Sequence, residues 1–244
     1  MIEISFPDKS VRSYEKGVTP LDIAQSISEG LARNVISASF NGNTFEASAP
    51  IMEDGFIKLY TWNDKEGKAA FWHSSAHILA QSLLSKYPQA KLTIGPAIEN
   101  GFYYDVDFGD ASFSEKDLPS LEEQFLIFAR EKFEFKMRMS SKSDALKFYQ
   151  KENNPYKIEL IKNLEDGTIS FCDHADFTDL CRGGHIPHSG LIKAVKLLSV
   201  AGAYWRGDET KPQLTRIYGI SFPKQKELKE HLLLLEEAKK RDHR

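Results

Sequence analysis

Two short stretches of the sequence each place side chains of metal-ligand or acid-base type four residues apart. HSSAH carries His73 and His77, and CRGGH carries Cys181 and His185. Residues four positions apart on a helix lie one turn apart on one face, so the histidine pair is expected to act together. The two glycines of CRGGH allow the backbone to approach a ligand closely. We therefore expect these four side chains to share one site.

Such a set of side chains suits either a metal or a substrate. Three histidines and a cysteine can complete a tetrahedral zinc shell, or three ligands can hold zinc while water takes the fourth position. HSSAH lacks the glutamate of H-E-x-x-H hydrolases, and the chain has no H-x-E paired with P-C-x-x-C as in zinc deaminases. The residues alone leave both interpretations open.

The remaining histidines near this motif and the second cysteine carry weaker signals. His174 and His188 have no spacing that favours a role, and we predict surface positions or satisfied core positions for them. Cys172 and Cys181 are the only cysteines, too few for a disulfide framework, and a reducing compartment would keep both as thiols. Cys181 is therefore available for chemistry.

Length and composition describe an ordinary globular chain. With 244 residues, 41% of them hydrophobic, it can bury a sizeable core in one or two domains. A formal net charge of −3 argues against a protein that coats nucleic acid by counterion release. The start, MIEISFPDKS, has no signal-peptide pattern, and no uncharged apolar run is long enough to span a membrane. We expect a cytoplasmic protein without membrane contact.

The first sixty or so residues predict a small sheet crossed by one helix. IEISFP and SVRSYE form a predicted hairpin, and Asn41-Gly42 predicts a second tight turn between strands. The helix should have Thr19 as its N-cap, Pro20 at its first position and Gly30 just past its end. This unit shows no cluster of titratable groups, which favours a docking module over a catalytic one.

A polar stretch from Trp62 to Lys68 separates this unit from the rest. Asn63 and Glu66 resemble a capping box, and the following long helix should bury one stripe and stop at Pro88. The stripe is Trp72, Ala76, Leu79 and Leu83, with both motif histidines beside it, facing outward from the edge of the core. Further strands are predicted in TIGPAIENGFYYDVDF, TISFCDH, AVKLLSVAGAYW and LTRIYGISF, and further helices in LPSLEEQFLIFAREKFEF, SKSDALKFYQKEN and the C-terminal PKQKELKEHLLLLEEAKKRDHR.

Six stretches together resemble the N-terminal region of bacterial-type threonyl-tRNA synthetases. They are FWHSSAHILAQSLL, IGPAIENGFYYDVD, DLCRGGH, AGAYWRGD, RIYG and EEAKKRDHR, in this order. The resemblance covers the whole chain and implies an α+β fold in three parts. A small ubiquitin-like β-grasp (TGS) domain would span residues 1–62, a larger mixed α/β editing domain 63–223, and a linker helix 224–244.

The resemblance also implies which residues form the site. The catalytic positions are His73, His77, Lys157, Asp179, Cys181 and His185, and the substrate-binding positions are Tyr104, Arg182 and Gly95. The first two histidines, Cys181 and His185 match the family's four-residue editing signature. Gly184 stands where some members carry proline, a departure that bears only on the stiffness of the loop.

The activity implied by this resemblance is hydrolysis of serine wrongly attached to threonine tRNA. Serine and threonine differ by one methyl group, which in a binding pocket is worth only about 1–3 kcal/mol, so a second sieve is needed. The ester is already activated, and a positioned water with a general base can cleave it without a metal. The alternatives are a zinc-dependent hydrolase with the four signature residues as ligands, and a tRNA-binding appendage without chemistry.

Individual roles follow from this implied reaction. His73 and Lys157 would orient and activate water, and Asp179 would hold the α-ammonium group or a neighbouring histidine. The terminal adenosine would stack beside aromatic residues of GFYYD. The remaining residues would shape and polarise the pocket: His77, Cys181 and His185.

The resemblance places ATP chemistry outside this chain. The sequence has no Gly-rich phosphate loop and no class II motif, so it should not aminoacylate tRNA. A class II catalytic domain and an anticodon-binding domain would follow RDHR in the family. ATP, magnesium and zinc are expected only there, with zinc at the editing site as the alternative. The expected partner is the 3′ end of tRNA(Thr) carrying serine; the parent enzyme would dimerise through the absent domains, leaving this chain a monomer.

Overall fold

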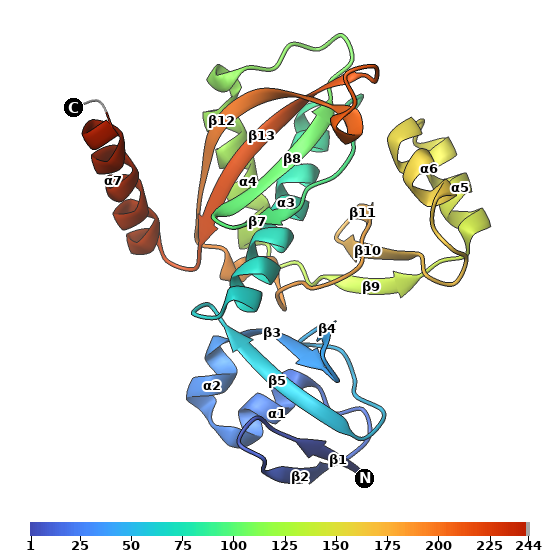
Figure 1. Ribbon diagram of the computed structural model, residues 1–244, viewed down its shortest axis with the longest axis vertical. Coiled ribbons are helices and arrows are strands. Elements are labelled where there is room, and N and C mark those ends of the chain that lie inside the picture. The colour runs from blue at the N-terminus through green and yellow to red at the C-terminus, as the bar shows by residue number, and fades with distance from the viewer. Residues whose placement is uncertain (243–244) are drawn as a thin grey trace.

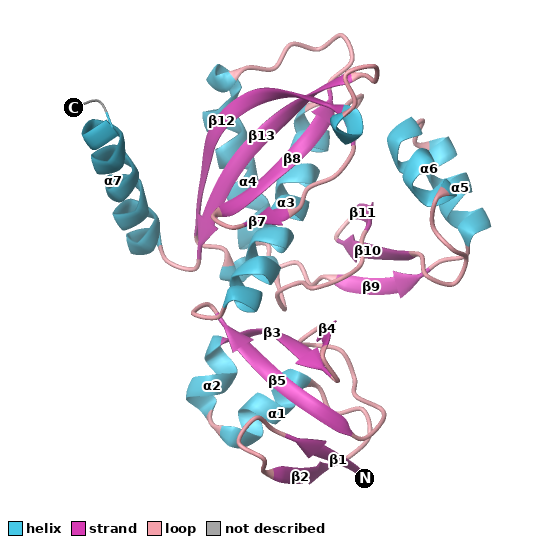
Figure 2. Cartoon of the chain, viewed as in Figure 1, coloured by secondary structure: helices cyan, strands magenta, loops and turns pink. Residues whose placement is uncertain are grey.

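The computed structural model describes residues 1–242, and the last two residues of the predicted C-terminal helix lie outside this range. The fold is α+β, with a sheet-and-helix domain at the N-terminus, a larger mixed part above it, and a helix at the C-terminus (Figures 1 and 2). No helix in the described part of the chain is both long and apolar enough to cross a membrane.

The N-terminal domain is a β-grasp sheet of five strands crossed by two helices. Its strands are β1 (Ile2–Ser5), β2 (Val11–Tyr14), β3 (Val35–Phe40), β4 (Asn43–Phe45) and β5 (Gly55–Thr61), and its helices are α1 (Pro20–Ile27) and α2 (Glu29–Asn34). The strand order is β2-β1-β5-β3-β4, with β1 and β5 parallel at the centre. Ile4, Ile23 and Ile57 are fully buried between the sheet and the helices.

Local sequence signals predicted most of the turns and helix ends of this domain correctly. Thr19 caps α1 in a capping box with Asp22, as the sequence predicted for the start of this helix. The tight turn between β3 and β4 is also confirmed, because Asn41 and Gly42 both have positive φ. The predicted end at Gly30 is wrong: the Ser28 side chain accepts a hydrogen bond from the backbone of Leu31 and starts α2, which contains the glycine.

The long helix α3 (Lys65–Lys86) begins the larger part of the molecule. Its N-cap is Asp64 rather than the predicted Asn63, and the Asp64 carboxylate accepts hydrogen bonds from Thr61 at the end of β5. The predicted apolar stripe is buried as expected. Burial extends much further round the helix, because β8, β13, α4 and β3 contact it on several sides.

An antiparallel sheet lies across one side of α3 (Figure 1). Its strands are β6 (Lys91–Leu92), β8 (Gly101–Asp107), β12 (Ala194–Tyr204) and β13 (Gln213–Phe222), in the order β12-β13-β8-β6, with β7 (Ala97–Ile98) paired to β8. Helix α4 (Leu118–Arg130) packs against both α3 and β12. This layered arrangement buries the main hydrophobic core and holds α3 in place.

A smaller sheet with two helices completes the larger part. It consists of β9 (Lys136–Met139), β10 (Ser170–His174) and β11 (Phe177–Leu180), together with α5 (Lys142–Lys151) and α6 (Pro155–Lys162). The sequence did not predict β9, β11 or α6. Short 3-10 turns lie at Glu115–Asp117, Ser189–Leu191 and Trp205–Gly207. Helix α7 (Gln225–Asp242) ends the described chain at the edge of the molecule (Figure 1), and its first turns contact β12 and β13, with Leu228 buried in the main core.

Candidate active site

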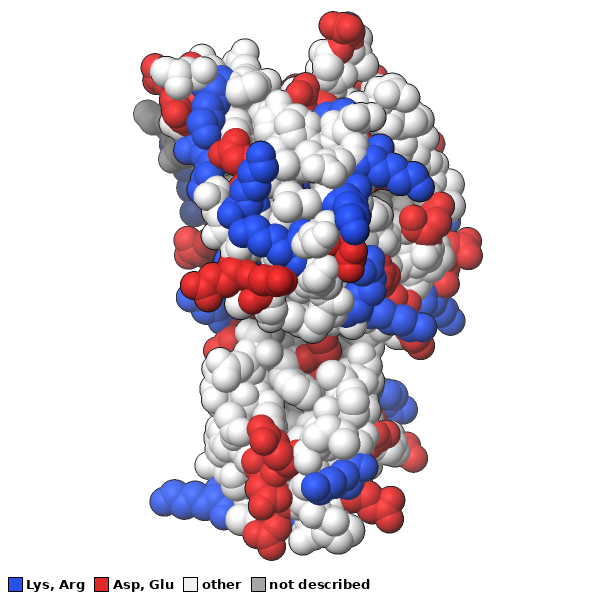
Figure 3. Space-filling model, turned by 90° about the vertical axis from the view of Figure 1, so that its right-hand side faces the viewer, with Lys and Arg blue, Asp and Glu red and all other residues white. Residues whose placement is uncertain are grey.

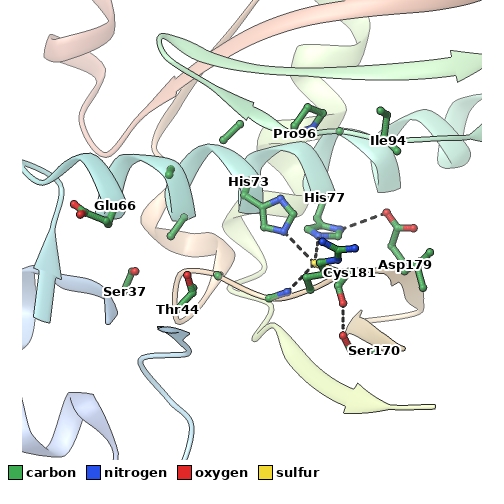
Figure 4. A pocket seen from close by; sticks show the side chains of 18 of the residues that line it. Ser37, Thr44, Glu66, His73, His77, Ile94, Pro96, Ser170, Asp179 and Cys181 are labelled. Carbon is green, nitrogen blue, oxygen red and sulfur yellow. Dashed lines mark hydrogen bonds and ion pairs between the residues drawn. The ribbon is translucent and has the colours of Figure 1, made fainter. Parts of the chain in front are cut away.

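The four side chains of the two motifs meet around the sulfur of Cys181. The Nε2 atom of His73 lies 3.0 Å from Sγ, that of His185 3.3 Å and that of His77 3.4 Å. Figure 4 shows both helix α3 histidines extending towards the cysteine on the loop that follows β11. The structure thus brings together residues separated by more than a hundred positions, as the sequence predicted.

The two histidines of α3 differ in exposure. His77 is 3% exposed, whereas His73 is only partly buried. The expectation that both face outward together is therefore wrong for His77, because the helix is enclosed on several sides. His73 is left as the histidine of this pair with more access to solvent.

The loop Cys181–His185 follows β11 and takes its shape from two glycines. Gly183 and Gly184 have φ values of 97° and 90°, a left-handed conformation that side-chain-bearing residues rarely adopt. The Gly183 N–H donates to Sγ of Cys181 at 3.3 Å. The backbone of the same cysteine is tied to Ser170 of β10, whose carbonyl accepts from the Cys181 N–H. The loop therefore presents the sulfur on a fixed backbone.

Asp179 of β11 forms a second centre beside the sulfur. Its Oδ1 lies 2.5 Å from Nζ of Lys157 and accepts a hydrogen bond from the Tyr149 hydroxyl at 3.2 Å. Its Oδ2 accepts from the Tyr104 hydroxyl at 3.0 Å and lies 3.7 Å from Nδ1 of His77. The carboxylate is thus surrounded by protein donors, and it links the lysine of α6 to the histidine of α3.

Gly95 has a packing role next to this centre. A Cβ atom placed on it would lie 2.2 Å from the ring of Tyr104, so only glycine lets the ring pack so closely against the backbone. Tyr104 is itself buried and directs its hydroxyl to Asp179. The other aromatic residues of GFYYD do not line the cavity, so the expected stacking of adenosine on this stretch has only an already engaged tyrosine to use.

A cavity of about 820 Å³ opens over these groups. Its lining includes the predicted residues Gly95, His73, His77, Tyr104, Lys157, Asp179, Cys181 and Arg182. His185 does not line it, because this side chain lies behind the sulfur. The opposite wall comes from the N-terminal domain, including Ser37, Thr44 and Tyr60. The cavity thus lies where the two parts of the molecule meet.

Two residues that contact the site were not predicted from the sequence. Glu46, directly after β4, accepts hydrogen bonds from Nδ1 of His185 at 2.9 Å and from two backbone N–H groups of the loop. Tyr149 of α5 binds Asp179 through its hydroxyl. Neither has a local signal: the glutamate stands alone in a domain without titratable clusters, and the tyrosine occupies a buried position on an amphipathic helix.

The charge state of Cys181 is governed by its neighbours. Burial disfavours the thiolate, but the charge of His77 and hydrogen bonds from all three histidines together hold the pKa of Cys181 well below its ordinary value. The pKa of His185 is raised, since its hydrogen bonds with Cys172, Cys181 and Glu46 outweigh burial. Burial lowers the pKa of His77, so its charge acts on the sulfur only when the ring is protonated, whereas the hydrogen bonds from His73 and His185 do not depend on that charge. The geometry therefore favours a thiolate facing a protonated His185.

His174 and His188 remain outside the cavity lining. His174 is 2% exposed and packs among Phe133, Phe135 and Phe177, which confirms a core position. Neither of its ring nitrogens has a hydrogen-bond partner among the described residues, so the expectation of a satisfied histidine is wrong. Burial lowers its pKa to about 3 and keeps it neutral.

The donor set around Cys181 also fits a metal. The ligand atoms of His73, His77, Cys181 and His185 all lie within 4.8 Å of one another. Three imidazole nitrogens and a thiolate are donors that zinc accepts in tetrahedral sites. The contact between Nδ1 of His185 and Glu46 adds the carboxylate–histidine pairing often found behind zinc ligands. These residues could therefore hold zinc.

Comparison with protein families identifies the class of both parts. Residues 2–61 match the TGS domain family. Residues 169–218, which include Asp179 and the CRGGH loop, match the family described as "Threonyl and Alanyl tRNA synthetase second additional domain". The chain therefore combines a TGS domain with an editing-type domain of these synthetases.

Whole-chain relatives narrow the assignment. Over all 244 residues the chain is 64% identical to the threonine–tRNA ligase of Flavobacterium johnsoniae and 64% identical to that of Flavobacterium psychrophilum. It is 58% identical to the threonine–tRNA ligase of Cytophaga hutchinsonii. The chain spans 37–38% of the length of these relatives. It is homologous to the N-terminal region of threonine–tRNA ligases.

Proposed function

We propose that this chain hydrolyses the ester that joins serine to the 3′ end of tRNA(Thr). The observation that carries the proposal is the convergence of three histidines on the Cys181 sulfur beside a cavity that Asp179 and Lys157 also line. Relatives named for joining threonine to tRNA support the choice of tRNA. In this scheme residues 1–62 form the TGS-like domain, 63–223 the editing domain and 224–244 the linker helix.

Selection of serine would rest on the polar lining of the cavity. Binding energy from one methyl group amounts to only about 1–3 kcal/mol, which limits the accuracy of a single pocket that must accept threonine. A second pocket can work in the opposite sense, by binding the serine hydroxyl and amine through polar groups and crowding the extra methyl of threonine. His73 and Cys181 are polar groups that line the cavity.

Water would attack the ester carbonyl carbon, and His73 is our candidate for its general base. Its ring lines the cavity and is less buried than that of His77. The proton taken from water would pass to the departing ribose oxygen, so atoms and charge balance over the reaction. Lys157 lines the same cavity and would orient the water. The Cys181 side chain, together with His77 and His185, would shape and polarise the pocket.

Asp179 is assigned a positioning role. Its oxygens already receive Lys157 and the hydroxyls of Tyr104 and Tyr149, and one of them faces His77. A carboxylate with these partners has little capacity left for a substrate ammonium group. Of the two roles considered from the sequence, we therefore favour the one in which this residue holds its neighbours.

A charged contact would help to hold the RNA strand. Arg182 is exposed at the cavity and makes no ion pair or hydrogen bond with any residue in the described range. Figure 3 shows several Lys and Arg side chains, interspersed with Asp and Glu, on the upper part of one face, above the waist that leads to the N-terminal domain. Free guanidinium groups suit phosphate, so we assign this arginine to the tRNA backbone near its 3′ end.

Zinc-dependent hydrolysis is the second candidate function, and the four-donor cluster favours it. His73, His77, Cys181 and His185 would hold the ion, which would supply a Lewis acid for the ester carbonyl. We favour the metal-free reaction because a histidine whose lone pair is bound to metal cannot also serve as the base. The ester is also reactive enough to be cleaved by a positioned water.

Release of free serine from seryl-tRNA(Thr) tests the proposal. We expect the purified chain to release serine faster than it releases threonine from threonyl-tRNA(Thr), and to show no ATP-dependent activation of threonine. A chain that binds both tRNAs and releases neither amino acid would instead be a tRNA-binding appendage. Threonine-dependent ATP turnover by this chain would contradict the expected separation of editing from aminoacylation.

A further inference from the structure

Glu46 is a charged residue of the N-terminal domain that reaches into the editing-type domain. It directly follows β4, and its Oε1 atom lies 2.9 Å from Nδ1 of His185 and 2.9 Å from the backbone nitrogen of Gly184. Its Oε2 accepts the backbone N–H of His185 at 3.0 Å. One carboxylate thus receives three donors from a loop nearly 140 residues further along the chain.

These contacts determine the direction of the hydrogen bond to the ring. Both carboxylate oxygens accept backbone N–H groups, which is the behaviour of an ionised carboxylate without a proton to donate. Nδ1 of His185 must therefore carry the proton. The opposite nitrogen, Nε2, is the one that lies 3.3 Å from the Cys181 sulfur. Glu46 therefore holds a proton on Nδ1 and fixes the ring orientation of the histidine behind the sulfur.

The loop also packs closely against β4 and the residue that follows it, Glu46. A Cβ atom on Gly184 would come within 3.1 Å of the Thr44 side chain, and one on Gly183 within 3.1 Å of the Glu46 carboxylate. Both glycines have positive φ, so the loop reaches this position in a conformation that other residues rarely adopt. A larger residue at either glycine would therefore disturb the contact between the loop and the N-terminal domain.

We propose that Glu46 is a positioning residue of the editing site, and that the N-terminal domain completes this site. The glutamate acts through His185, which holds the Cys181 sulfur towards the cavity. Its catalytic consequence rests on the proposed hydrolysis of seryl-tRNA(Thr). The N-terminal domain is then part of the hydrolytic machinery, and not only the docking module that its sequence indicated.

The test compares Glu46→Gln with wild type and with Glu53→Gln. Glu53 is an exposed glutamate of the same domain with no hydrogen bond or ion pair among the described residues, so it controls for the loss of charge. In Glu46→Gln the amide group opposes a backbone donor of the loop. We expect kcat for serine release to fall about 10-fold or more, with KM nearly unchanged, because carboxylates behind catalytic or metal-bound histidines contribute at this level. The Glu53→Gln rate should equal that of wild type.

Nitrogen NMR of the His185 ring gives a second readout that a purely structural contact would not move. With the signals assigned through His185→Gln, wild type should carry a proton on Nδ1, and Glu46→Gln should lose this preference. A folded Glu46→Gln protein with wild-type kcat, or a wild-type ring protonated on Nε2 alone, overturns the inference. If wild type releases no serine, the proposed function fails, and the protonation of Nδ1 alone decides the role of Glu46. The wild-type spectrum also decides it if the variant does not fold.

Discussion

The Nζ atom of Lys157 lies 2.5 Å from Oδ1 of Asp179, and their side chains are only 3% and 6% exposed. This pair joins α6 to β11 directly beneath the cavity. Two tyrosine hydroxyls share the carboxylate, so the charges are compensated on several sides. A buried pair of this kind is tolerated because each partner has its counterpart, and removal of one partner leaves an uncompensated charge.

Lys157→Met and Asp179→Asn should each destabilise the fold. We expect each variant to lower the free energy of unfolding by about 3–5 kcal/mol, the usual effect of breaking a buried ion pair. The double variant should lose much less than the sum of the two, since it leaves no isolated charge. Urea unfolding of the four proteins measures this. Simple additivity would show that the two charges do not stabilise each other.

His73→Ala should slow the release of serine while leaving the fold intact. The residue lines the cavity and is only partly buried, and a positioned general base usually contributes about 10²-fold or more. Single-turnover hydrolysis of seryl-tRNA(Thr) measures the step directly. His231→Ala, on the C-terminal helix and absent from the cavity lining, serves as the matched control. Equal rates for the two variants would remove His73 from the role of base.

The protein should contain one thiolate at neutral pH. The pKa of Cys181 lies well below its ordinary value, because the charge of His77 and the hydrogen bonds of the three histidines outweigh burial, whereas burial raises the pKa of Cys172. Thiolate ultraviolet absorbance in chelator should therefore persist in Cys172→Ser and vanish in Cys181→Ser. Absorbance that vanishes in Cys172→Ser and persists in Cys181→Ser would show that Cys172, and not Cys181, is the thiolate.

The lowered pKa of Cys181 makes the free energy of unfolding depend on pH. The folded pKa of Cys181 is lower than its unfolded value, near the ordinary 9.0, so the thiolate's contribution is complete above that pH. It decreases as pH falls towards the folded pKa, where the thiolate takes up a proton. The stability difference between wild type and Cys181→Ser should therefore diminish on acidification. A difference that grows on acidification would contradict the lowered pKa.

Arg182→Ala should weaken binding of the RNA and leave the chemical step unchanged. The guanidinium is exposed and unpaired among the described residues, which suits contact with a phosphate. Loss of one phosphate contact on a single strand should reduce the slope of log affinity against log salt by about 0.7. Arg33→Ala, an exposed arginine of α2, provides a control for net charge. Identical salt slopes for the two variants would argue against this contact.

Much of the fold could be predicted from local patterns. Thr19, the Asn41-Gly42 turn and the buried stripe of α3 are signals contained in a few neighbouring residues, and the structure confirms them. The predicted end of α1 at Gly30 is wrong because Ser28 caps a second helix, α2. Gly30 lies inside that helix and does not end the first one. Short elements such as α6 have too few residues for a clear period.

In the candidate site, local patterns predict the motif residues but not their partners that are distant in the sequence. Motif spacing was enough to predict that His73, His77, Cys181 and His185 meet, because each pair is local and the loop glycines mark a close approach. Glu46 could not be found in this way. Its partners are about 140 positions away in the chain, and only the packing of β4 against the loop brings them together.

Serine release from seryl-tRNA(Thr) by metal-depleted protein tests the central claim most directly. Wild type and Cys181→Ser would be measured side by side after chelation, with residual zinc determined in the same samples. We predict that wild type continues to release serine and spares threonyl-tRNA(Thr), and that the variant is strongly impaired. Loss of wild-type activity on chelation with recovery on adding zinc would contradict the metal-free reaction, and no serine release under either condition would contradict the proposed function itself.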